Sequence, residues 1–538
     1  MIEIVNVNLS TTWILIYTGL VIGITSMITN WLRMRRHFDK LNIPGPKPLP
    51  IIGNFNLIIK HGLPYNDLIL TQKYGKTLGF FMGSGPVVET TDLRLIKSVL
   101  IKDFSIFTNR KRIEAMMFEP YDHFLSLIKD EEWKSIRAVL STSFTSGKLK
   151  SMSKLMMECS NQLNNHLKKV ADQDGTFNGK DYFEGFTLDV ICSCCFGFSV
   201  DSINDPNNEI IKHLKNLFLD SMTKDPRFML IILFPKLATF LRKRNMLELF
   251  PKSSIEYLQD FDFYNNAKTQ RINQNIEMIF IQSMIEHEEN VEKNIIEQQH
   301  LSDDEETNWN LKDARYFKKK LTVAEIFSQA AMFLIAGMET TANTLNLIAY
   351  NLAKHQDVQQ KLIDEVDQVL ENNNGEIDHE TVKKMSYMSM VIDETLRMFP
   401  AAVFLERLAS QDFEFEGMKI EKGQKIVVPL WALHRDPDLY PEPDNFDPER
   451  FSDQNKLKRD SNAYLPFGNG PRNCLGMRFA LLEIKLALTN IMTKFRFETC
   501  EKTPTMIEID SSGFARPKIP VVLQIKIDIN LNLSLLEK

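Results

Sequence analysis

The sequence predicts a mainly α-helical protein with small β-sheets, preceded by a single membrane anchor helix. An uncharged apolar segment near the amino terminus predicts the anchor. From residue 51 to about residue 280 most of the sequence is helix-forming, and short β-like runs such as 77–81 and 87–90 interrupt it. A long candidate helix over residues 322–355 has apolar residues around most of its circumference, which is typical of a helix that crosses a large core.

Composition excludes several classes of protein. The chain has 538 residues, of which 43% are hydrophobic, so it can bury a large core. Its net charge of -6 provides no overall positive field for binding nucleic acid. The six cysteines have neither the density of a disulfide scaffold nor the spacing of a zinc module, so a reducing compartment is expected.

The amino-terminal segment reads as a signal anchor. No charged residue lies between Glu3 and Arg33, and residues 13–32 are long and apolar enough to span a bilayer. Several basic residues follow directly, whereas only Glu3 precedes, so we expect everything after residue 33 to lie in the cytosol. A cleaved secretory peptide is the alternative, but a basic start and a small-x-small cleavage site are missing.

The chain that follows residues 1–32 predicts a linker and then one domain. Residues 33–50 are basic and then proline-rich, with four prolines that fix φ and prevent helix formation, so we expect a stiff spacer before a single domain over residues 51–538. Within that domain, residues 287–320 are highly charged and have almost no apolar periodicity. We interpret them as a solvated connector, with a regulatory or docking segment as the alternative.

The long candidate helix carries residues that are costly in a helix interior. Thr322 and Glu325 have capping-box spacing at its start. Further along come Gly337 and the polar cluster 339–341. A mid-helix glycine costs about 1 kcal/mol relative to alanine, and a buried unsatisfied polar group costs about 1 to 3 kcal/mol. Either the threonine hydroxyls bond to the carbonyls four residues earlier, or a bulky ligand packs against the glycine while a hydroxyl faces it.

A second group of candidate residues is charged. Glu394 and Arg397 are three residues apart, on one face of a predicted helix and inside the apolar stretch 388–399. Downstream, Arg450 ends an irregular, proline-rich stretch and could join them as a third member. A buried charge group of this kind must be fully hydrogen-bonded, so it would fix geometry more than it adds stability.

Cys474 lies in a stiff, glycine-rich loop, PFGNGPRNCLG, over residues 466–476. Its three glycines permit tight turns that bring backbone amides close to the sulfur, and Pro471 stiffens the loop. An amphipathic helix is predicted directly after it, so the helix dipole, the amides and Arg472 are expected to favour a thiolate. Such a thiolate could act as a nucleophile, a zinc ligand or a haem ligand.

The neighbouring sequence weighs against two of these roles. Zinc is disfavoured because the nearest other cysteine is Cys500 and no histidine lies close by in the sequence. A nucleophilic cysteine normally needs a histidine partner, for which His434 is the nearest candidate. An inert buried cysteine would not explain three glycines and an arginine around it.

The motifs together resemble those of the cytochrome P450 superfamily, the haem-thiolate monooxygenases. PFGNGPRNCLG resembles the cysteine-loop signature, and AGMETT (336–341) resembles the oxygen-activation motif. Glu394 and Arg397 match the ExxR pair, and PERF (448–451) matches the meander. All four stand in the family's order. The stretches FTNR, DEEWKSIR, SFTSGKLK and ALHRDP are similar to the microsomal xenobiotic-metabolising group that includes the vertebrate 3A enzymes.

The resemblance implies a haem b cofactor, with Cys474 as the iron ligand and Phe467 packed beside its sulfur. On the other side of the haem, Gly337 would leave room for dioxygen, and Ala336 is a further expected cofactor contact. There Thr340 and Glu339 would hold water and relay protons. The family's positions for partners of the haem propionates match Arg110, Trp133, Arg137, Arg407 and Arg472.

The implied reaction inserts one oxygen atom of O2 into a lipophilic small molecule such as a xenobiotic, a steroid or a fatty-acid-like compound. No dinucleotide-binding GxGxxG motif follows a predicted strand, so the electrons of NADPH must arrive through a separate protein. The expected partner is NADPH-cytochrome P450 reductase at the endoplasmic reticulum membrane, docking near Lys134 and Arg137, with cytochrome b5 as a second candidate. The positions matching the family's substrate pocket are Ser126, Leu127, Ile335, Ala402, Val403, Phe404, Gly513 and Phe514.

Two other interpretations stay open from the sequence. One is a haem protein that only binds or rearranges its ligand, without a reductase, although the presence of Thr340 favours a monooxygenase. The other is a membrane-tethered cysteine hydrolase with Cys474 as its nucleophile.

Overall fold

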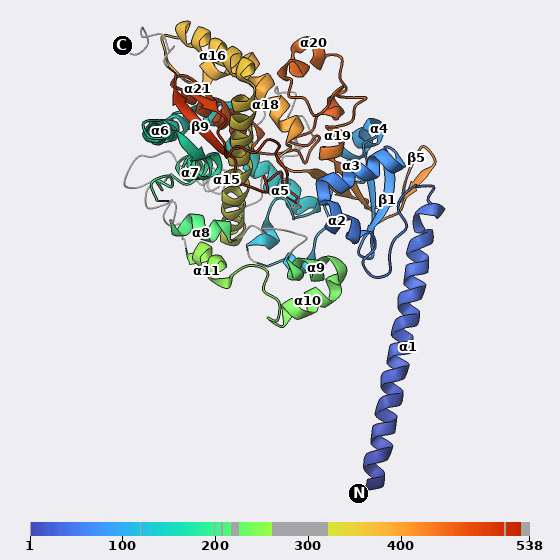
Figure 1. Cartoon of the computed structure of the whole chain (residues 1–538). Helices are drawn as coiled ribbons and strands as arrows, with labels where there is room; N and C mark the ends of the chain where they lie inside the picture. Colours follow the sequence, from blue (N-terminus) through green and yellow to red (C-terminus); the bar gives the residue numbers. More distant parts are fainter. Residues whose placement is uncertain are drawn as a thin grey trace.

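The amino-terminal helix extends further than the sequence predicts. The structure is a computed structural model that describes residues 2–118, 120–197, 200–205, 208–216, 225–260, 321–510 and 513–528. Helix α1 (Ile2–Lys40) projects away from the rest of the chain, as Figure 1 shows. Its segment Trp13–Lys40 is long and apolar enough to cross a membrane, and the large apolar side chains from Trp13 to Leu32 are mostly exposed. The helix does not stop at residue 32, because the basic residues after it continue the same helix.

The segment expected to be a spacer is packed against the first sheet. Met34 and Phe38 of α1 are buried together with Leu41. The ring of Phe38 occupies the space beside Gly79, where a Cβ atom would lie 2.3 Å from it. Gly79 donates its N–H to the carbonyl of Pro44 at 2.7 Å. The segment predicted to be a stiff spacer therefore also packs against the domain.

The domain is mainly helical, with short strands. Its helices are α2 (Phe55–His61), α3 (Leu63–Tyr74), α4 (Leu93–Lys97), α5 (Asp130–Ser141), α6 (Ser146–Ala171), α7 (Gly179–Ile191), α8 (Glu209–Lys215), α9 (Pro226–Leu233), α10 (Pro235–Lys243), α11 (Lys252–Asp260), α15 (Val323–Lys354), α16 (Gln356–Glu371), α17 (His379–Lys383), α18 (Ser386–Met398), α19 (Leu430–Leu433), α20 (Asp453–Lys456) and α21 (Met477–Met492). Its strands are β1 (Thr77–Met82), β2 (Gly85–Thr90), β3 (Thr176–Asn178), β4 (Phe404–Leu408), β5 (Phe413–Phe415), β6 (Met418–Ile420), β7 (Lys425–Pro429), β8 (Phe495–Glu498) and β9 (Val522–Ile527).

The strands form three small sheets. The largest has the order β1-β2-β7-β4, in which β2 and β7 are parallel and the other pairs antiparallel. The second has the order β3-β9-β8, and β5 pairs with β6 as a hairpin. The β-like runs predicted at 77–81 and 87–90 are β1 and β2. The predicted fold class, mainly α with small sheets behind an apolar amino-terminal helix, is confirmed.

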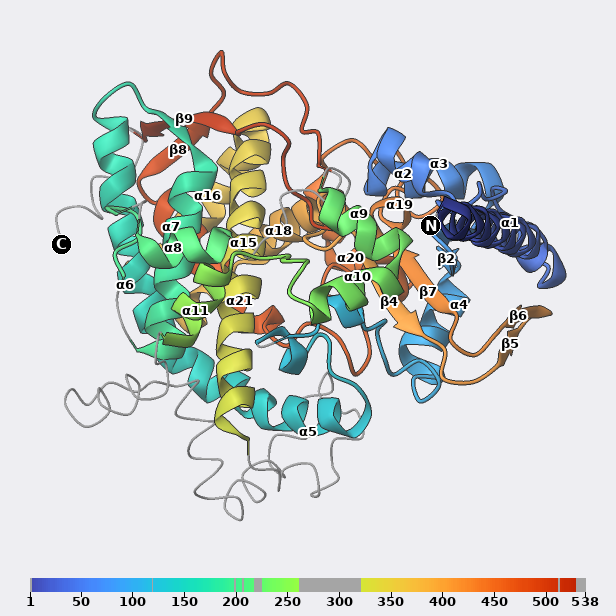
Figure 2. The ribbon, with the colours of Figure 1, turned by 90° about the horizontal axis from the view of Figure 1, so that it is seen from below.

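Helix α15 crosses the middle of the helical region, as Figures 1 and 2 show. Its predicted capping box forms: Glu325 donates its N–H to the Thr322 hydroxyl at 3.2 Å, and the Glu325 carboxylate accepts the N–H of Thr322 at 2.9 Å. From residue 341 to residue 353 every residue of α15 is buried. The predicted connector over residues 287–320 lies outside the described residues.

One buried carboxyl group in the core predicts a pH-dependent stability. Glu483 of α21 is 1% exposed, neither of its carboxyl oxygens has a hydrogen-bond partner, and burial raises its pKa well above the usual range. Above the pKa of an unfolded glutamate the folded protein therefore retains a proton that the unfolded chain releases, so stability falls as pH rises. This loss amounts to about 1.4 kcal/mol per pH unit until the folded-state pKa is reached.

We expect Glu483→Gln to remove this slope. Urea unfolding of both proteins between about pH 5 and pH 8 should show the variant gaining stability over the original chain as pH rises. Glu501→Gln, at an exposed position shortly after α21, serves as the control and should leave the slope unchanged. A stability difference that stays constant with pH would contradict the burial of an uncompensated carboxyl group.

Candidate active site beneath the central helix

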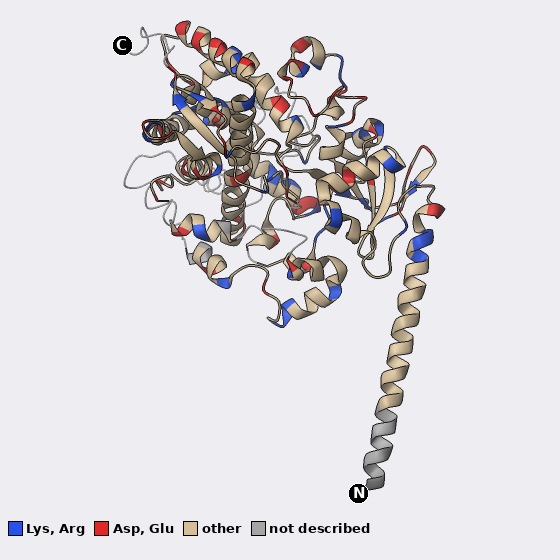
Figure 3. Cartoon of the chain, viewed as in Figure 1, with Lys and Arg blue, Asp and Glu red and all other residues tan. Residues whose placement is uncertain are grey.

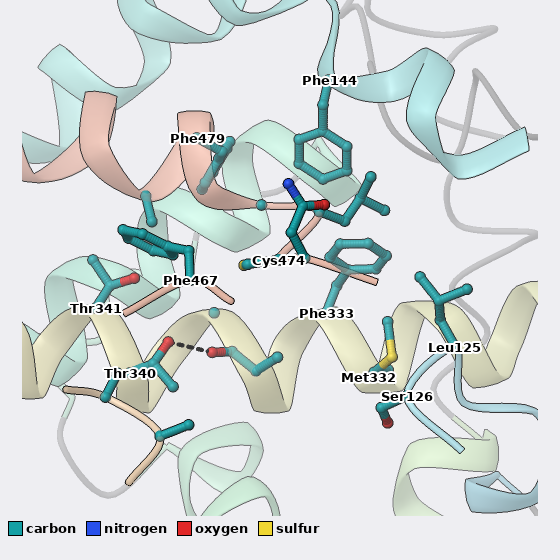
Figure 4. A pocket seen from close by; sticks show the side chains of 18 of the residues that line it. Leu125, Ser126, Phe144, Met332, Phe333, Thr340, Thr341, Phe467, Cys474 and Phe479 are labelled. Carbon is teal, nitrogen blue, oxygen red and sulfur yellow. Dashed lines mark hydrogen bonds between the residues drawn. The ribbon is translucent and has the colours of Figure 1, made fainter. Parts of the chain in front are cut away.

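A cavity of about 340 Å³ lies between α15, the loop before α21 and the first turn of α21. Figure 4 shows Cys474 on one side of it, with Phe467 and Phe479 nearby, and Thr340 on the α15 side. Cys474 has exposed surface, and that surface faces the cavity. Residues from both motifs that the sequence singled out are thus brought together. Those predicted site residues that line the cavity are Arg110, Ser126, Trp133, Arg137, Ala336, Gly337, Thr340, Ala402, Phe467, Arg472 and Cys474.

Two of the three glycines of the cysteine loop are required by the path of its backbone. Gly468 and Gly470 have φ of 75° and 72°, a region that other residues rarely adopt. A Cβ atom on Gly470 would also lie 2.0 Å from the carbonyl oxygen of Leu100. The loop closes with the N–H of Cys474 bonded to the carbonyl of Phe467 at 2.8 Å. This geometry holds the sulfur toward the cavity from a backbone that has little freedom.

The charge state of Cys474 differs from the sequence prediction. Burial raises the pKa of the Cys474 thiol, and this exceeds the opposing effects of the Gly476 N–H, Arg137 and Arg110. The prediction named Arg472 as the stabilising cation, but Arg137 and Arg110 have that role in the structure. Burial therefore opposes the predicted thiolate, and a cation bound to the sulfur would favour it.

Four arginines form a buried positive cluster beside the cavity. Burial and mutual repulsion lower the pKa of Arg472 to about 8 and of Arg407 to about 9, while burial lowers that of Arg137 to about 10 and that of Arg110 as well. Arg407 does not line the cavity but is only 2% exposed. Two nitrogens of Arg472 and one of Arg407 are buried without a hydrogen-bond partner. Such a cluster is costly unless an anionic group bonds to these nitrogens.

Two of these arginines are oriented by neighbouring groups. Arg137 of α5 donates to the carbonyl and side-chain oxygens of Asn473 at 2.9 and 2.7 Å. Arg472 stacks on Trp133 at 4.4 Å and donates to the carbonyl of Ile128 at 2.8 Å. Because Arg137 is buried, it cannot serve as the surface docking charge that the sequence suggested, and Lys134 forms an ion pair with Glu131 at 2.8 Å.

On the α15 side of the cavity, Thr340 satisfies both alternatives that the sequence left open, a hydroxyl bonded within the helix and a hydroxyl that faces a ligand site. The Thr340 hydroxyl donates to the carbonyl of Ala336 at 2.6 Å, which is the helix back-bond, and Thr340 also lines the cavity. The missing Cβ of Gly337 leaves space for Ile191 of α7, whose Cδ1 atom would lie 2.6 Å from it. The glycine therefore accommodates a packed side chain as well as facing the cavity.

Glu339 does not lie at the cavity as the sequence suggested. It is 6% exposed and forms an ion pair with Arg516, which comes from the chain near the carboxyl end. Burial raises the pKa of Glu339, and Arg516 opposes this rise. A carboxylate locked in this ion pair is not positioned to hold water beside Thr340.

The charged group downstream is assembled, and its Glu394–Arg397 pair is fully buried. Arg397 and Glu394 are both 0% exposed and form two hydrogen bonds of 2.7 and 2.8 Å. Arg450 lies 3.4 Å from the Glu394 carboxylate, which also accepts the N–H of Asp447 at 3.0 Å. Arg397 donates further to the carbonyl of His434 at 2.9 Å. The group thus ties α18 to the irregular chain before the cysteine loop.

Of the residues expected to contact substrate, Ser126 and Ala402 line the cavity. Val403 is fully buried instead, and its N–H bonds to the carbonyl of Gly513 at 3.0 Å. Val403 and Gly513 do not line the cavity themselves. The other expected contacts that do not line the cavity are Leu127, Ile335, Phe404 and Phe514.

Several lining residues were missed by the sequence analysis. On α15 they are Met332, Phe333, Thr341 and Thr344, which stand one helical turn from the residues that were predicted, so helical periodicity could have found them. Four others are direct sequence neighbours of predicted residues: Leu125, Ala401, Leu405 and Asn473. Further ones carry no such signal: Phe144, Ile191, Cys195, Leu396, Phe479 and Ile484.

Comparison with known proteins identifies the family. The cytochrome P450 family model matches residues 43–525 of this chain. The chain belongs to the cytochrome P450 family. It is 38% identical to cytochrome P450 3A31 of Mesocricetus auratus over 521 residues, and to cytochrome P450 3A5 of Homo sapiens over 517 residues. Each alignment covers 96% of both chains. This cytochrome P450 is therefore a monooxygenase that uses haem, dioxygen and electrons from NADPH, and the cysteine-hydrolase interpretation is excluded.

The chemistry of the residues that line the cavity fits a haem group. A thiol is held toward the cavity at one side, and buried arginine nitrogens without partners stand beside it, which suits a macrocycle that carries two carboxylates. The lining is otherwise mostly apolar, as a flat aromatic ring system requires.

Proposed function

We propose that this cytochrome P450 is anchored in the endoplasmic reticulum membrane with its catalytic domain in the cytosol, and that it oxidises lipophilic small molecules. Residues 1–32 form the anchor and residues 51–538 the catalytic domain, joined by residues 33–50. The apolar helix and the basic residues after it support this orientation. Electrons come from NADPH-cytochrome P450 reductase, with cytochrome b5 as a second donor.

The proposed haem site has Cys474 as its iron ligand and the buried arginines as partners of the propionates. Bound haem supplies the activation of dioxygen, from which one oxygen atom enters the substrate. Phe467 covers the sulfur, and Arg110, Arg137, Arg407 and Arg472 provide donors. The observation that carries the proposal is that buried nitrogens of Arg407 and Arg472 have no hydrogen-bond partner among the described residues. Trp133 holds the plane of Arg472.

Thr340 is the proposed proton donor group on the opposite side. Its hydroxyl lies at the cavity wall and can exchange its bond to the Ala336 carbonyl for one to a bound water. Glu339 lies outside the cavity, so its proposed part in proton relay requires its ion pair with Arg516 to open first.

We expect Thr340→Ala to uncouple oxygen consumption from product formation. NADPH oxidation should continue while the yield of product per NADPH falls by about tenfold or more, because a positioned general acid is lost. The comparison is with Thr344→Ala, which removes another hydroxyl from the same helix face and cavity. Equal yields from both variants and the original chain would rule out the role of Thr340.

The substrate is proposed to be lipophilic because the cavity offers few polar groups apart from the arginines and threonines. Entry from the lipid is supported by α9 and α10, where Phe234, Leu237 and Phe240 are exposed apolar residues.

The function is tested by reconstitution with the reductase. Purified protein, haem, lipid and NADPH-cytochrome P450 reductase should oxidise NADPH faster when a lipophilic substrate is added, with product formed in proportion. A haem protein that only binds or rearranges its ligand would show no substrate-dependent NADPH oxidation, and that result would refute the proposed reductase coupling.

A further inference from the structure

A second cavity, of about 300 Å³, lies where α1 meets the domain. It is lined by Leu32, Arg33, Arg36, His37, Lys40, Leu41 and Glu421. It begins where the apolar part of α1 ends, and Figure 3 shows the basic residues at that end of α1. If α1 spans the membrane as proposed above, this cavity lies at the level of the lipid headgroups.

The cavity is rich in basic side chains, and its two arginines and its lysine have no ion-pair partner among the described residues. Within the part of the chain that the structure describes, no ion pair is found for Arg33, Arg36 or Lys40. The Nε2 atom of His37 is buried and has no hydrogen-bond partner. Three basic side chains and an imidazole around one small cavity suit a phosphate group, because each can donate to its oxygens.

One acidic residue shares the cavity with these cations. The Glu421 carboxylate lies 4.0 Å from Nδ1 of His37, and 58% of its side chain is exposed. A carboxylate disfavours a bare anion but suits a ligand that carries an ammonium group beside its phosphate. Headgroups with both groups are those of the aminophospholipids, phosphatidylethanolamine and phosphatidylserine.

The walls of the cavity are held in place by the packing of α1 on the domain. The indole N–H of Trp31 donates to the carbonyl of Pro48 at 2.8 Å, and Phe38 and His37 contact Phe81 edge-on at 5.2 and 5.7 Å between ring centres. A ligand bound here would therefore contact both the anchor, through the arginines, and the domain, through Glu421.

We propose that this cavity binds one aminophospholipid headgroup, with its phosphate between Arg33, Arg36 and Lys40 and its ammonium group on Glu421. The lipid would fasten the anchor to the domain at the membrane surface. The inference depends on the proposed membrane anchor and not on the oxidation reaction.

The test uses the haem-loaded full chain in phosphatidylcholine nanodiscs that contain a small share of phosphatidylethanolamine, phosphatidylserine or phosphatidylglycerol with identical acyl chains. Lipids retained after transfer to detergent are counted by native mass spectrometry. We expect retention of the two aminophospholipids in preference to phosphatidylglycerol, and we expect millimolar inorganic phosphate not to displace them.

Two double variants separate a site from a diffuse positive field. R33Q/R36Q removes two charges from the cavity and should lower the retained aminophospholipid by roughly 30-fold. R35Q/K47Q removes two charges from the same region, but Arg35 stacks on Trp31 and Lys47 pairs with Asp39, so it should lower retention by less than about 3-fold. E421Q should keep the phosphate contacts and lose the preference over phosphatidylglycerol.

Four results would overturn the proposal. Equal losses in both double variants would mean a diffuse electrostatic attraction, and equal retention of phosphatidylglycerol by the original chain would mean no ammonium subsite. Displacement by inorganic phosphate would mean a site for free phosphate. Failure of the chain to enter the nanodisc would refute the membrane anchor itself, which is a separate outcome because it is seen before any lipid is counted.

Discussion

In our account, Cys474→Ala abolishes monooxygenase activity, with turnover falling by more than about 100-fold. Loss of a residue that only supports a metal ligand costs up to about 100-fold, so loss of the ligand itself should cost more. The reason is that no other sulfur among the described residues is held toward the cavity by so rigid a loop, in which Gly470 approaches the Leu100 carbonyl too closely for any side chain. The measurement is substrate oxidation with the reductase, together with the absorption spectrum of the purified variant.

Cys195→Ala is the matched control for this prediction. Cys195 also lines the cavity, but it lies in the π-helical turn Cys192–Phe196 that follows α7, and burial raises the pKa of its thiol to about 12. Its replacement should leave the haem spectrum and the turnover close to those of the original chain. If Cys474→Ala keeps the original spectrum while Cys195→Ala loses it, the assignment of the ligand is wrong.

Arg397→Met is expected to destabilise the domain by about 3 to 5 kcal/mol. The substitution leaves Glu394 with no partner of comparable strength in a fully buried site, since Arg450 reaches only one of its oxygens, at 3.4 Å. It also removes the bond to the His434 carbonyl. Because domains of this kind are stable by only about 5 to 15 kcal/mol, much of the variant should fail to fold during expression at 37 °C.

The control for Arg397→Met is Lys383→Met. Glu380 and Lys383 have the same three-residue spacing on a helix, but both side chains are more than half exposed, and such pairs contribute about 0 to 1 kcal/mol. Thermal unfolding and the yield of folded, haem-containing protein compare the two variants. Similar losses from both would show that the burial of the Glu394 group is not what stabilises the domain.

The sequence predicted those features that depend on neighbouring residues. Three predicted features involve only a few consecutive residues each, and all three form: the capping box of α15, the tight cysteine loop and the Glu394–Arg397 pair. The fold class followed from the same local patterns, since the long apolar helix and the short β-like runs are properties of contiguous sequence.

Features set by distant partners could not be predicted. Glu339 was placed at the cavity because it precedes Thr340, but its ion-pair partner Arg516 lies 177 residues further along the chain. The linker was expected to be a stiff spacer because of its prolines, and its packing on the domain could not be predicted, since Phe38 fits against Gly79 only once the first sheet has formed. Glu483 has no feature in the sequence that distinguishes it from an exposed helical glutamate.

The central claim is that Cys474 binds haem iron through its sulfur. The most direct test is the carbon monoxide difference spectrum of the reduced, purified full-length protein. Our account predicts the strongly red-shifted absorption peak of a thiolate-ligated haem, and it predicts that Cys474→Ala loses that peak. A peak at the position typical of histidine-ligated haem in the original chain, or no peak after haem has been supplied, would contradict the account.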